Sequence, residues 1–215
     1  MNPSTPLLQI DALGFAYPGQ PAIATGWSAA IGPGVTLLYG DTGAGKSALL
    51  QVIAGALPAS GELSVAGTRL SASPEAYRRS VFFVDPSTER FDQATVRQCT
   101  ASLREGDAGF SDERWQALVE GFSLTPHLEK SMFMLSTGSK RKVWLAAALA
   151  SSRPLVLLDE PAAALDAGSV RCLWRSLGEL AAHGERTGAA RAFLVASAER
   201  LDTVPLAATI ALPLP

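Results

Sequence analysis

One stretch of this sequence, residues 40–47, has the residue types that could hold a polyphosphate. It reads Gly-Asp-Thr-Gly-Ala-Gly-Lys-Ser and fits the pattern G-x-x-x-x-G-K-[ST] at every fixed position. Glycines allow a tight turn whose N–H groups point inward, where Cβ atoms would keep phosphate out. Lys46 would place its charge on the β- and γ-phosphates, and the Ser47 hydroxyl would coordinate Mg²⁺. The predicted polyphosphate-binding residues are Gly40, Asp41, Thr42, Gly43, Ala44, Gly45, Lys46, Ser47 and Ala48.

A second stretch places two carboxylates directly after an apolar run. Residues 155–158 read Leu-Val-Leu-Leu, and Asp159, Glu160 and Pro161 follow. At the end of a buried strand, Asp159 could hold Mg²⁺ through water and Glu160 could accept a proton from an attacking water. The alternative is an ordinary acidic turn, and the phosphate loop in the same chain favours the catalytic interpretation.

A third stretch, residues 135–143, reads Leu-Ser-Thr-Gly-Ser-Lys-Arg-Lys-Val and leads into an alanine-rich helix. Taken alone it is a Ser/Gly N-cap followed by a basic turn, which has a purely structural explanation. Its position just before the acidic strand favours a functional role.

The elements around these stretches predict an α/β fold. An apolar strand at 35–39 precedes the phosphate loop, and a helix follows it from Lys46 to about residue 54. A strand at 155–158, a helix at 169–183 and a strand at 192–196 follow later. This order predicts a parallel sheet that is covered on both faces.

The remaining segments predict two additions to that core. Strands at 7–17, 22–31, 61–65 and 68–70 are separated by turn signals and read as hairpins, and 81–84 reads as a buried strand. From residue 86 to about 150 the strand signals give way to helices at 94–103, 112–121 and 139–150. We expect this block to form an inserted helical lobe.

The composition excludes several classes of protein. Of the 215 residues, 47% are hydrophobic and 18% charged, which is typical of a globular α/β chain with a surface suited to a partner. The net charge of −2 gives no electrostatic footprint for nucleic acid. Cys99 and Cys172 show no metal or redox spacing, the sequence has no long apolar run, and residues 1–6 lack a secretory pattern. We expect a cytoplasmic protein.

Together the three stretches resemble the ATP-binding cassette (ABC) ATPases of ABC transporters, members of the P-loop NTPase superfamily, over nearly the whole chain. Residues 40–47 match the family's Walker A and 155–161 its Walker B, with Glu160 at the catalytic glutamate. Residues 135–139 resemble the LSGGQ signature, from which Thr137 and Ser139 depart. Residues 162–166, ending at Asp166, match the D-loop, and Tyr17 lies where the family stacks an aromatic ring on adenine.

The resemblance implies a RecA-like core (residues 1–85 and 151–215) with an N-terminal antiparallel β subdomain and an inserted helical subdomain (86–150) that carries the signature. It also implies ATP and Mg²⁺, with Ser136 and Gly138 contacting the γ-phosphate bound by a second cassette in a head-to-tail dimer, as homodimer or heterodimer. A separate transmembrane permease subunit would be the other partner, which places the chain peripherally on the cytoplasmic face of the membrane. The LSTG-type signature and the short length favour an exporter-like or biogenesis complex.

Two family positions are replaced here. Asp85 stands where the family has a glutamine that touches Mg²⁺, and it adds a negative charge near phosphate. Ser197 stands where the family has a histidine that contacts the γ-phosphate, and neither His127 nor His183 is placed to replace it. We therefore expect slow turnover or dependence on a partner site.

Two alternatives remain open at this point. One is a soluble ABC ATPase acting on DNA or a ribosome, although such proteins usually carry coiled-coil insertions or two cassettes. The other is a soluble or degenerate ABC-type nucleotide switch with little hydrolysis, which Asp85 and Ser197 favour and Glu160 opposes.

Overall fold

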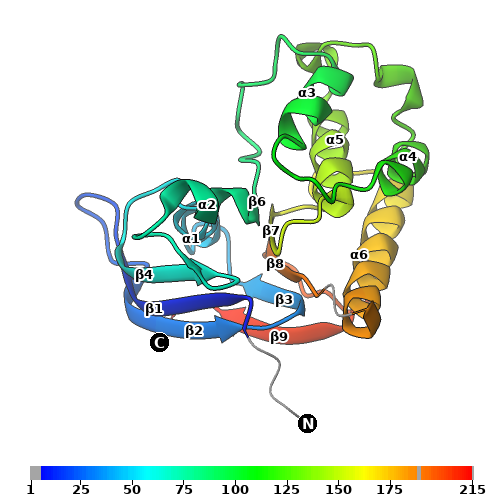
Figure 1. Cartoon of the computed structure of the whole chain (residues 1–215). Helices are drawn as coiled ribbons and strands as arrows, with labels where there is room; N and C mark the ends of the chain where they lie inside the picture. Colours follow the sequence, from blue (N-terminus) through cyan, green and yellow to red (C-terminus); the bar gives the residue numbers. More distant parts are fainter. Residues whose placement is uncertain (1–5, 188–189, 215) are drawn as a thin grey trace.

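A computed structural model describes residues 6–187 and 190–214, without the side chains of residues 183–187. It contains two sheets, and a group of helices stands above them in Figure 1. One sheet is antiparallel with the order β2-β1-β4-β5, and the other is parallel with the order β6-β7-β8-β3-β9. The predicted α/β fold with a parallel core and an N-terminal antiparallel unit is confirmed.

The strands are β1 (Leu8–Phe15), β2 (Ala24–Ile31), β3 (Gly34–Tyr39), β4 (Ser60–Val65), β5 (Thr68–Arg69), β6 (Val81–Phe82), β7 (Leu155–Asp159), β8 (Ala192–Ser197) and β9 (Leu206–Ala211). The helices are α1 (Lys46–Ile53), α2 (Pro74–Arg79), α3 (Val96–Leu103), α4 (Asp112–Gly121), α5 (Thr137–Ala150) and α6 (Ala167–Thr187), with 3₁₀ turns η1 (Thr125–His127) and η2 (Met132–Met134).

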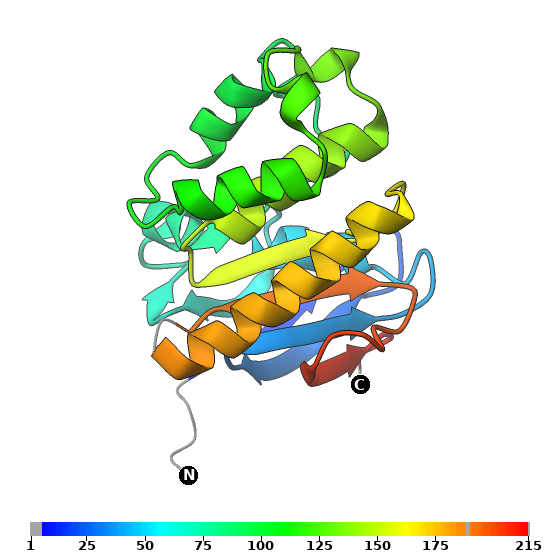
Figure 2. The ribbon, with the colours of Figure 1, turned by 90° about the vertical axis from the view of Figure 1, so that its right-hand side faces the viewer.

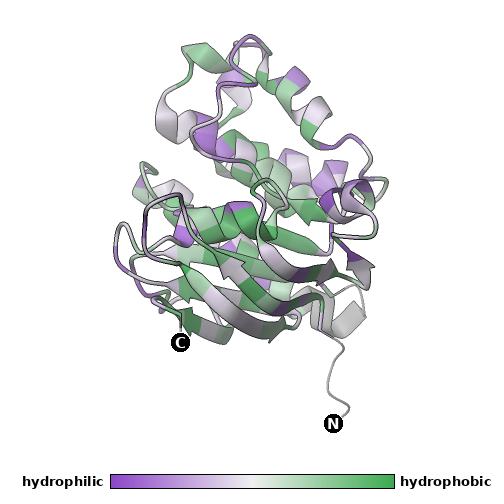
Figure 3. Ribbon diagram, turned by 90° about the vertical axis from the view of Figure 1, so that its left-hand side faces the viewer, coloured by the Kyte–Doolittle hydropathy of each residue, from purple (hydrophilic) through white to green (hydrophobic). Residues whose placement is uncertain are grey.

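The central strands are apolar on both faces because both faces are covered. In β7, Val156 and Leu158 belong to one buried cluster, while Leu155 and Leu157 belong to the other. The first cluster includes the helices α4, α5 and α6, and the second includes α1 and the antiparallel sheet. Figure 2 shows α6 lying across one face of the parallel strands, and Figure 3 shows the hydrophobic residues along strands and helices between the layers. Continuous apolar runs in the sequence are the result.

Two side chains tie the helical segments to the parallel sheet. Arg153, just before β7, donates to the carbonyl oxygen of Val81 in β6 at 3.3 Å and to that of Leu103 in α3 at 3.1 Å. Asp107, in the loop before α4, accepts from Ser151 Oγ at 2.6 Å, directly after α5. The division of the chain at residues 85/86 and 150/151 into subdomains stays a prediction.

The structure differs from the sequence-based elements in three places. The strand expected at 81–84 is only the two-residue β6, because it is an edge strand that pairs solely Val81 with Leu155 and Phe82 with Val156. Helix α2 and strand β9 were not predicted, since α2 is only six residues long and β9 is mostly exposed. Within the described residues no helix is both long and apolar enough to cross a membrane.

Candidate functional site

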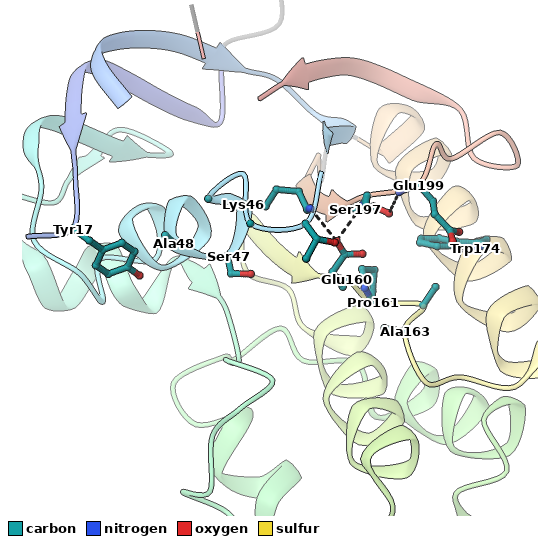
Figure 4. Close-up of a pocket in the computed structure, with 15 residues that line it drawn as sticks. Tyr17, Lys46, Ser47, Ala48, Glu160, Pro161, Ala163, Trp174, Ser197 and Glu199 are labelled. Atoms are coloured by element: carbon teal, nitrogen blue, oxygen red, sulfur yellow. Dashed lines mark hydrogen bonds and ion pairs between the residues drawn. The ribbon is translucent and has the colours of Figure 1, made fainter. Parts of the chain in front are cut away.

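The register of the parallel sheet brings the separate motifs to one edge. Tyr39 at the end of β3 pairs with Ser197 at the end of β8, and Asp159 at the end of β7 pairs with Ala196 of β8. The phosphate loop follows β3 and Glu160 follows β7, so both leave the sheet beside Ser197 (Figure 4). The carboxyl edge of an open parallel sheet is where such folds bind ligands.

The phosphate loop has a conformation that requires glycine. Gly43 has φ +85° and Gly45 has φ +93°, a region that side chains disfavour. A Cβ atom on Gly45 would also lie 2.8 Å from the side chain of Ile23. The backbone bonds of α1 begin with Leu49 N–H to Gly45 O at 2.9 Å, which leaves the first amides of the helix facing the loop as an anion-binding end.

A cavity of about 570 Å³ opens at this edge. It is lined by Tyr17, Thr42, Gly43, Gly45, Lys46, Ser47, Ala48, Glu160, Pro161, Ala162, Ala163, Trp174, Ser197, Ala198 and Glu199. Three predicted loop residues, Gly40, Asp41 and Ala44, are not among its lining residues. Among the described side chains, Lys46 is the only cation in the lining, where it stands with the carboxylates of Glu160 and Glu199.

Lys46 is buried and fully engaged. Its Nζ donates to Gly40 O at 2.7 Å and to Asp41 O at 3.0 Å, and it lies 3.2 Å from Glu160 Oε1. The backbone carbonyls fix the ammonium group at the mouth of the loop, while Glu160 occupies the side that faces the cavity (Figure 4).

Glu160 is held by its backbone as well as its side chain. Its φ of +42° is unusual for a residue with a side chain and turns the chain sharply after β7. Its N–H donates to Ala196 O at 3.0 Å, and Oε1 accepts from the N–H of Ala198 at 3.0 Å. Arg141 of α5 donates to the carbonyl oxygens of Glu160 and Ala163, which clamps this turn from below. The carboxylate is therefore fixed at the edge of the cavity.

Asp159 has a carboxylate oxygen, Oδ1, that is buried without a hydrogen-bond partner. Burial raises the pKa of this carboxyl, and the charges of Glu160 and Asp85 raise it further, against a hydrogen bond from Ser47 and the charge of Arg141. A divalent cation beside Ser47 would coordinate the unpaired Oδ1 of Asp159 and would neutralise part of the negative charge of Asp159, Glu160 and Asp85. The residues therefore fit Mg²⁺. The described part of the chain contains no group of three or more His, Cys, Asp or Glu residues that could hold a metal ion.

Asp85 lies after the short β6 and outside the cavity lining, but its negative charge reaches Asp159. Ser197 lines the cavity, is 7% exposed, and its Oγ accepts from the N–H of Glu199 at 3.0 Å. His127 lies in η1, and the side chain of His183 lies outside the described residues. The described part of the chain therefore places no imidazole at this edge.

Three predicted site residues, Ser136, Gly138 and Asp166, are not among the residues that line the cavity. Ser136 is exposed at the N-cap of α5, and a Cβ atom on Gly138 would lie 2.3 Å from Ala164 O. Asp166 is exposed, accepts from Lys142 Nζ at 2.6 Å and caps α6 through Ser169. The structure thus packs the start of α5 against the loop that follows Glu160, and brings neither Ser136 nor Gly138 to the phosphate loop of the same chain.

Tyr17 lies at the other end of the cavity, in the connection between β1 and β2 (Figure 4). Its ring is 38% exposed and meets Phe15 edge-on, with ring centroids 5.1 Å apart. An exposed aromatic face at this position could stack on a planar base.

Sequence reasoning missed several residues here. Gln51 contacts Asp85, and its place four residues after Ser47 on one helix face was a usable signal. Arg141 acts through backbone carbonyls, for which a sequence has no signature. Trp174 and Glu199 line the far end of the cavity, and Glu199 could have been found only from its nearness to Ser197.

Comparison with known proteins gives a consistent result. A family model described as "ABC transporter" matches residues 28–163. The chain is 35% identical over 196 residues to the cytochrome c biogenesis ATP-binding export protein CcmA of Rhodospirillum rubrum, covering 90% of this chain and 81% of that protein. It is 34% identical over 190 residues to the cobalt import ATP-binding protein CbiO of Rhodobacter capsulatus, covering 84% and 68%. A solved ATP-binding subunit of an ABC transporter matches its fold with a TM-score of 0.74 at 24% identity, covering 89% and 79%.

Proposed function

The chain belongs to the ABC transporter family as an ATP-binding subunit, and from that premise we propose that it hydrolyses ATP at the cavity above the phosphate loop. The observation that carries this proposal is the position of Glu160, whose carboxylate lies 3.2 Å from the Lys46 ammonium at the edge of that cavity. A base and a phosphate-binding cation held together at one strand edge are two of the groups that hydrolysis of a phosphoanhydride uses.

In this proposal the loop residues bind the phosphates and Tyr17 stacks on the base. Lys46 and the open amides of α1 hold the β- and γ-phosphates, while Glu160 accepts the proton of the attacking water. Ser197 would hydrogen-bond near the γ-phosphate without adding charge. Ser47, Asp159 and Asp85 would hold Mg²⁺, which supplies positive charge to the phosphate oxygens when bound.

The signature residues would act on a second subunit. Ser136 is exposed at the start of α5 and lies outside the chain's own cavity, so its use requires another copy or a related chain. In a head-to-tail pair, Ser136 and Gly138 of one chain would meet the γ-phosphate held by the other, and Asp166 would lie in the loop between them. Because half of the charge stabilisation comes from the partner, we expect a monomer to be nearly inactive.

We further propose slow hydrolysis in the isolated protein. In the described part of the chain Lys46 is the only cation lining the cavity, while Asp85 and Ser197 replace an amide and an imidazole of the family pattern. A slow enzyme and a nucleotide switch that does not hydrolyse differ in the rate of ATP hydrolysis by the purified chain.

The remaining partner would be a transmembrane permease subunit, with this chain on the cytoplasmic face of the membrane. Phe133 and Met134, at the end of the helical segment that precedes α5, are 57% and 61% exposed. Adjacent large apolar side chains at that exposure are suited to burial by another protein. The similar proteins CcmA and CbiO are named for export and for import.

The test is ATP hydrolysis by the purified chain over a range of protein concentrations, with the Glu160→Gln variant alongside. A rate per subunit that rises with concentration and vanishes in the variant is the expected result. Tight ATP binding with no turnover at any concentration would mean a switch, or a chain that needs its permease. If the protein binds no ATP and Lys46→Ala changes nothing, the proposal is wrong.

A further inference from the structure

Asp85, the residue that replaces the family's glutamine, is held from both sides. Gln51 Nε2 donates to Asp85 Oδ2 at 2.7 Å. Ser87 donates to Asp85 Oδ1 through its N–H at 2.8 Å and through its Oγ at 2.6 Å. Both carboxylate oxygens are therefore engaged, and the carboxylate has one orientation at the end of β6.

Gln51 connects this carboxylate to the phosphate-binding helix. Gln51 follows Ser47 by four residues in α1, so the two side chains lie on the same face of that helix. Burial raises the pKa of the Asp159 carboxyl, and the nearby negative charges of Glu160 and Asp85 raise it further. Gln51 thus lies one helical turn from Ser47 and holds Asp85, and both Ser47 and Asp85 are among the groups proposed to hold the cation.

The hydrogen bonds to Asp85 reduce the repulsion between its carboxylate and a bound polyphosphate. A free carboxylate beside a polyphosphate would repel it, whereas donors on a carboxylate withdraw part of its charge and keep it from turning toward the phosphates. Ser87 lies next to Asp85 in the same loop and moves with it, while Gln51 belongs to α1. Only the bond from Gln51 fixes the carboxylate relative to the nucleotide.

We propose that Gln51 is a positioning residue for metal–nucleotide binding. It holds the Asp85 carboxylate in an orientation that binds the cation and limits its repulsion of the phosphates. This rests on the proposed binding of ATP with Mg²⁺. Gln51 would not touch the reacting atoms, and its effect would pass entirely through Asp85.

The experiment measures the binding of a fluorescent ATP analogue at increasing Mg²⁺, and in EDTA, so that no turnover is needed. Gln51→Met keeps the length of the side chain without the donor. We expect it to raise the Mg²⁺ concentration at half-effect about fivefold, while binding in EDTA changes less than about twofold. Gln9→Met is the matched control, because it removes a bond from a glutamine to Asp11 in β1, far from the cavity. That control should change neither the Mg²⁺ concentration at half-effect nor the binding in EDTA.

A second background distinguishes positioning from a general structural effect. With Asp85→Asn, no charge remains to be directed, so adding Gln51→Met should then shift the Mg²⁺ dependence less than about twofold. The proposal is wrong if Gln51→Met shifts the Mg²⁺ dependence equally in the parent and in the Asp85→Asn protein, or shifts it in neither. Gln51→Glu, which sets two carboxylates against each other, should raise the Mg²⁺ requirement even if Gln51→Met folds poorly. Absence of any Lys46-dependent binding by the parent protein would instead refute the proposed function.

Discussion

Lys46 Nζ lies 3.2 Å from Glu160 Oε1 and also donates to two backbone carbonyls, those of Gly40 and Asp41. An ammonium group has three protons, so its donors are all engaged before any phosphate arrives. The Lys46 side chain is 6% exposed and Glu160 38%, which places the carboxylate on the side open to the cavity. A bound phosphate must therefore compete with Glu160 for Lys46.

The first prediction concerns this competition. Glu160→Gln should tighten binding of ADP about fivefold, because the neutral amide holds Lys46 less strongly and no longer repels phosphate. ADP is used so that blocked hydrolysis cannot imitate the effect. The measurement is a fluorescence titration with an ADP analogue.

The control for that variant is Glu199→Gln, which removes the same charge from the far end of the same cavity. Glu199 makes no described ion pair with Lys46, so its variant should change ADP affinity less than about twofold. Equal effects of the two variants would mean that total charge, rather than the contact with Lys46, governs affinity.

The second prediction separates capping from catalysis at the start of α5. Ser136 Oγ accepts from Ser139 N–H at 3.2 Å, so Ser136→Ala should cost about 1 kcal/mol of unfolding free energy. Ser111 accepts from Arg114 N–H at 3.1 Å at the start of α4 and is the matched control. Urea unfolding should show similar losses of unfolding free energy for both alanine variants. Only Ser136→Ala should lower the rate of ATP hydrolysis, by about tenfold or more, because it removes a donor that stabilises charge in the transition state. Parallel losses of activity would contradict a role for Ser136 in the partner's site.

The phosphate loop and the acidic strand could be predicted because their chemistry is local. Glycines at 43 and 45 indicate a backbone conformation that residues with side chains disfavour, and both have positive φ in the structure. The apolar runs before Gly40 and Asp159 indicated strands of a covered sheet, and the register of β3, β7 and β8 follows once they are parallel. The site edge was therefore predictable even though its parts are more than a hundred residues apart.

The contacts that the sequence did not reveal depend on tertiary approach. Gln51 and Asp85 are 34 residues apart and meet only because the short β6 delivers Asp85 next to α1. Arg141 binds backbone carbonyls, which every residue carries. Strand β9 was missed because an edge strand with exposed alanines lacks the apolar pattern of its neighbours.

The third prediction addresses the missing positive charge beside the phosphates. Ser197 lines the cavity at the end of β8, so Ser197→His would place an imidazole near the γ-phosphate. We expect the rate of ATP hydrolysis to rise about tenfold, on the scale of one added electrostatic group. Ser197→Ala removes the hydroxyl without adding charge and should lower the rate. If the histidine and alanine variants behave alike, the serine does not limit turnover.

The fourth prediction is a pH dependence of stability that comes from Asp107. Burial alone would raise the pKa of this carboxyl, but hydrogen bonds from Ser151 and Ser152 and the charge of Arg153 outweigh it, and the pKa is lowered. A carboxyl whose pKa is lower in the folded state stabilises the fold above its unfolded pKa of about 3.9, and that contribution is lost as the pH falls through the folded value. Stability should therefore rise with pH across this acidic range.

Asp107→Asn should make the protein less stable at pH 7 and should flatten this dependence, because the amide accepts fewer hydrogen bonds and does not ionise. Urea unfolding midpoints at several values between about pH 7 and about pH 2.5 measure both effects, and the gap between variant and parent should narrow below the unfolded pKa of about 3.9. Asp202→Asn removes an exposed carboxylate for which no side-chain hydrogen bond is described and controls for net charge. A gap that stays constant with pH would show that Asp107 contributes shape and hydrogen bonding, but no ionisation-linked stability, to the junction between α5 and the helical segment.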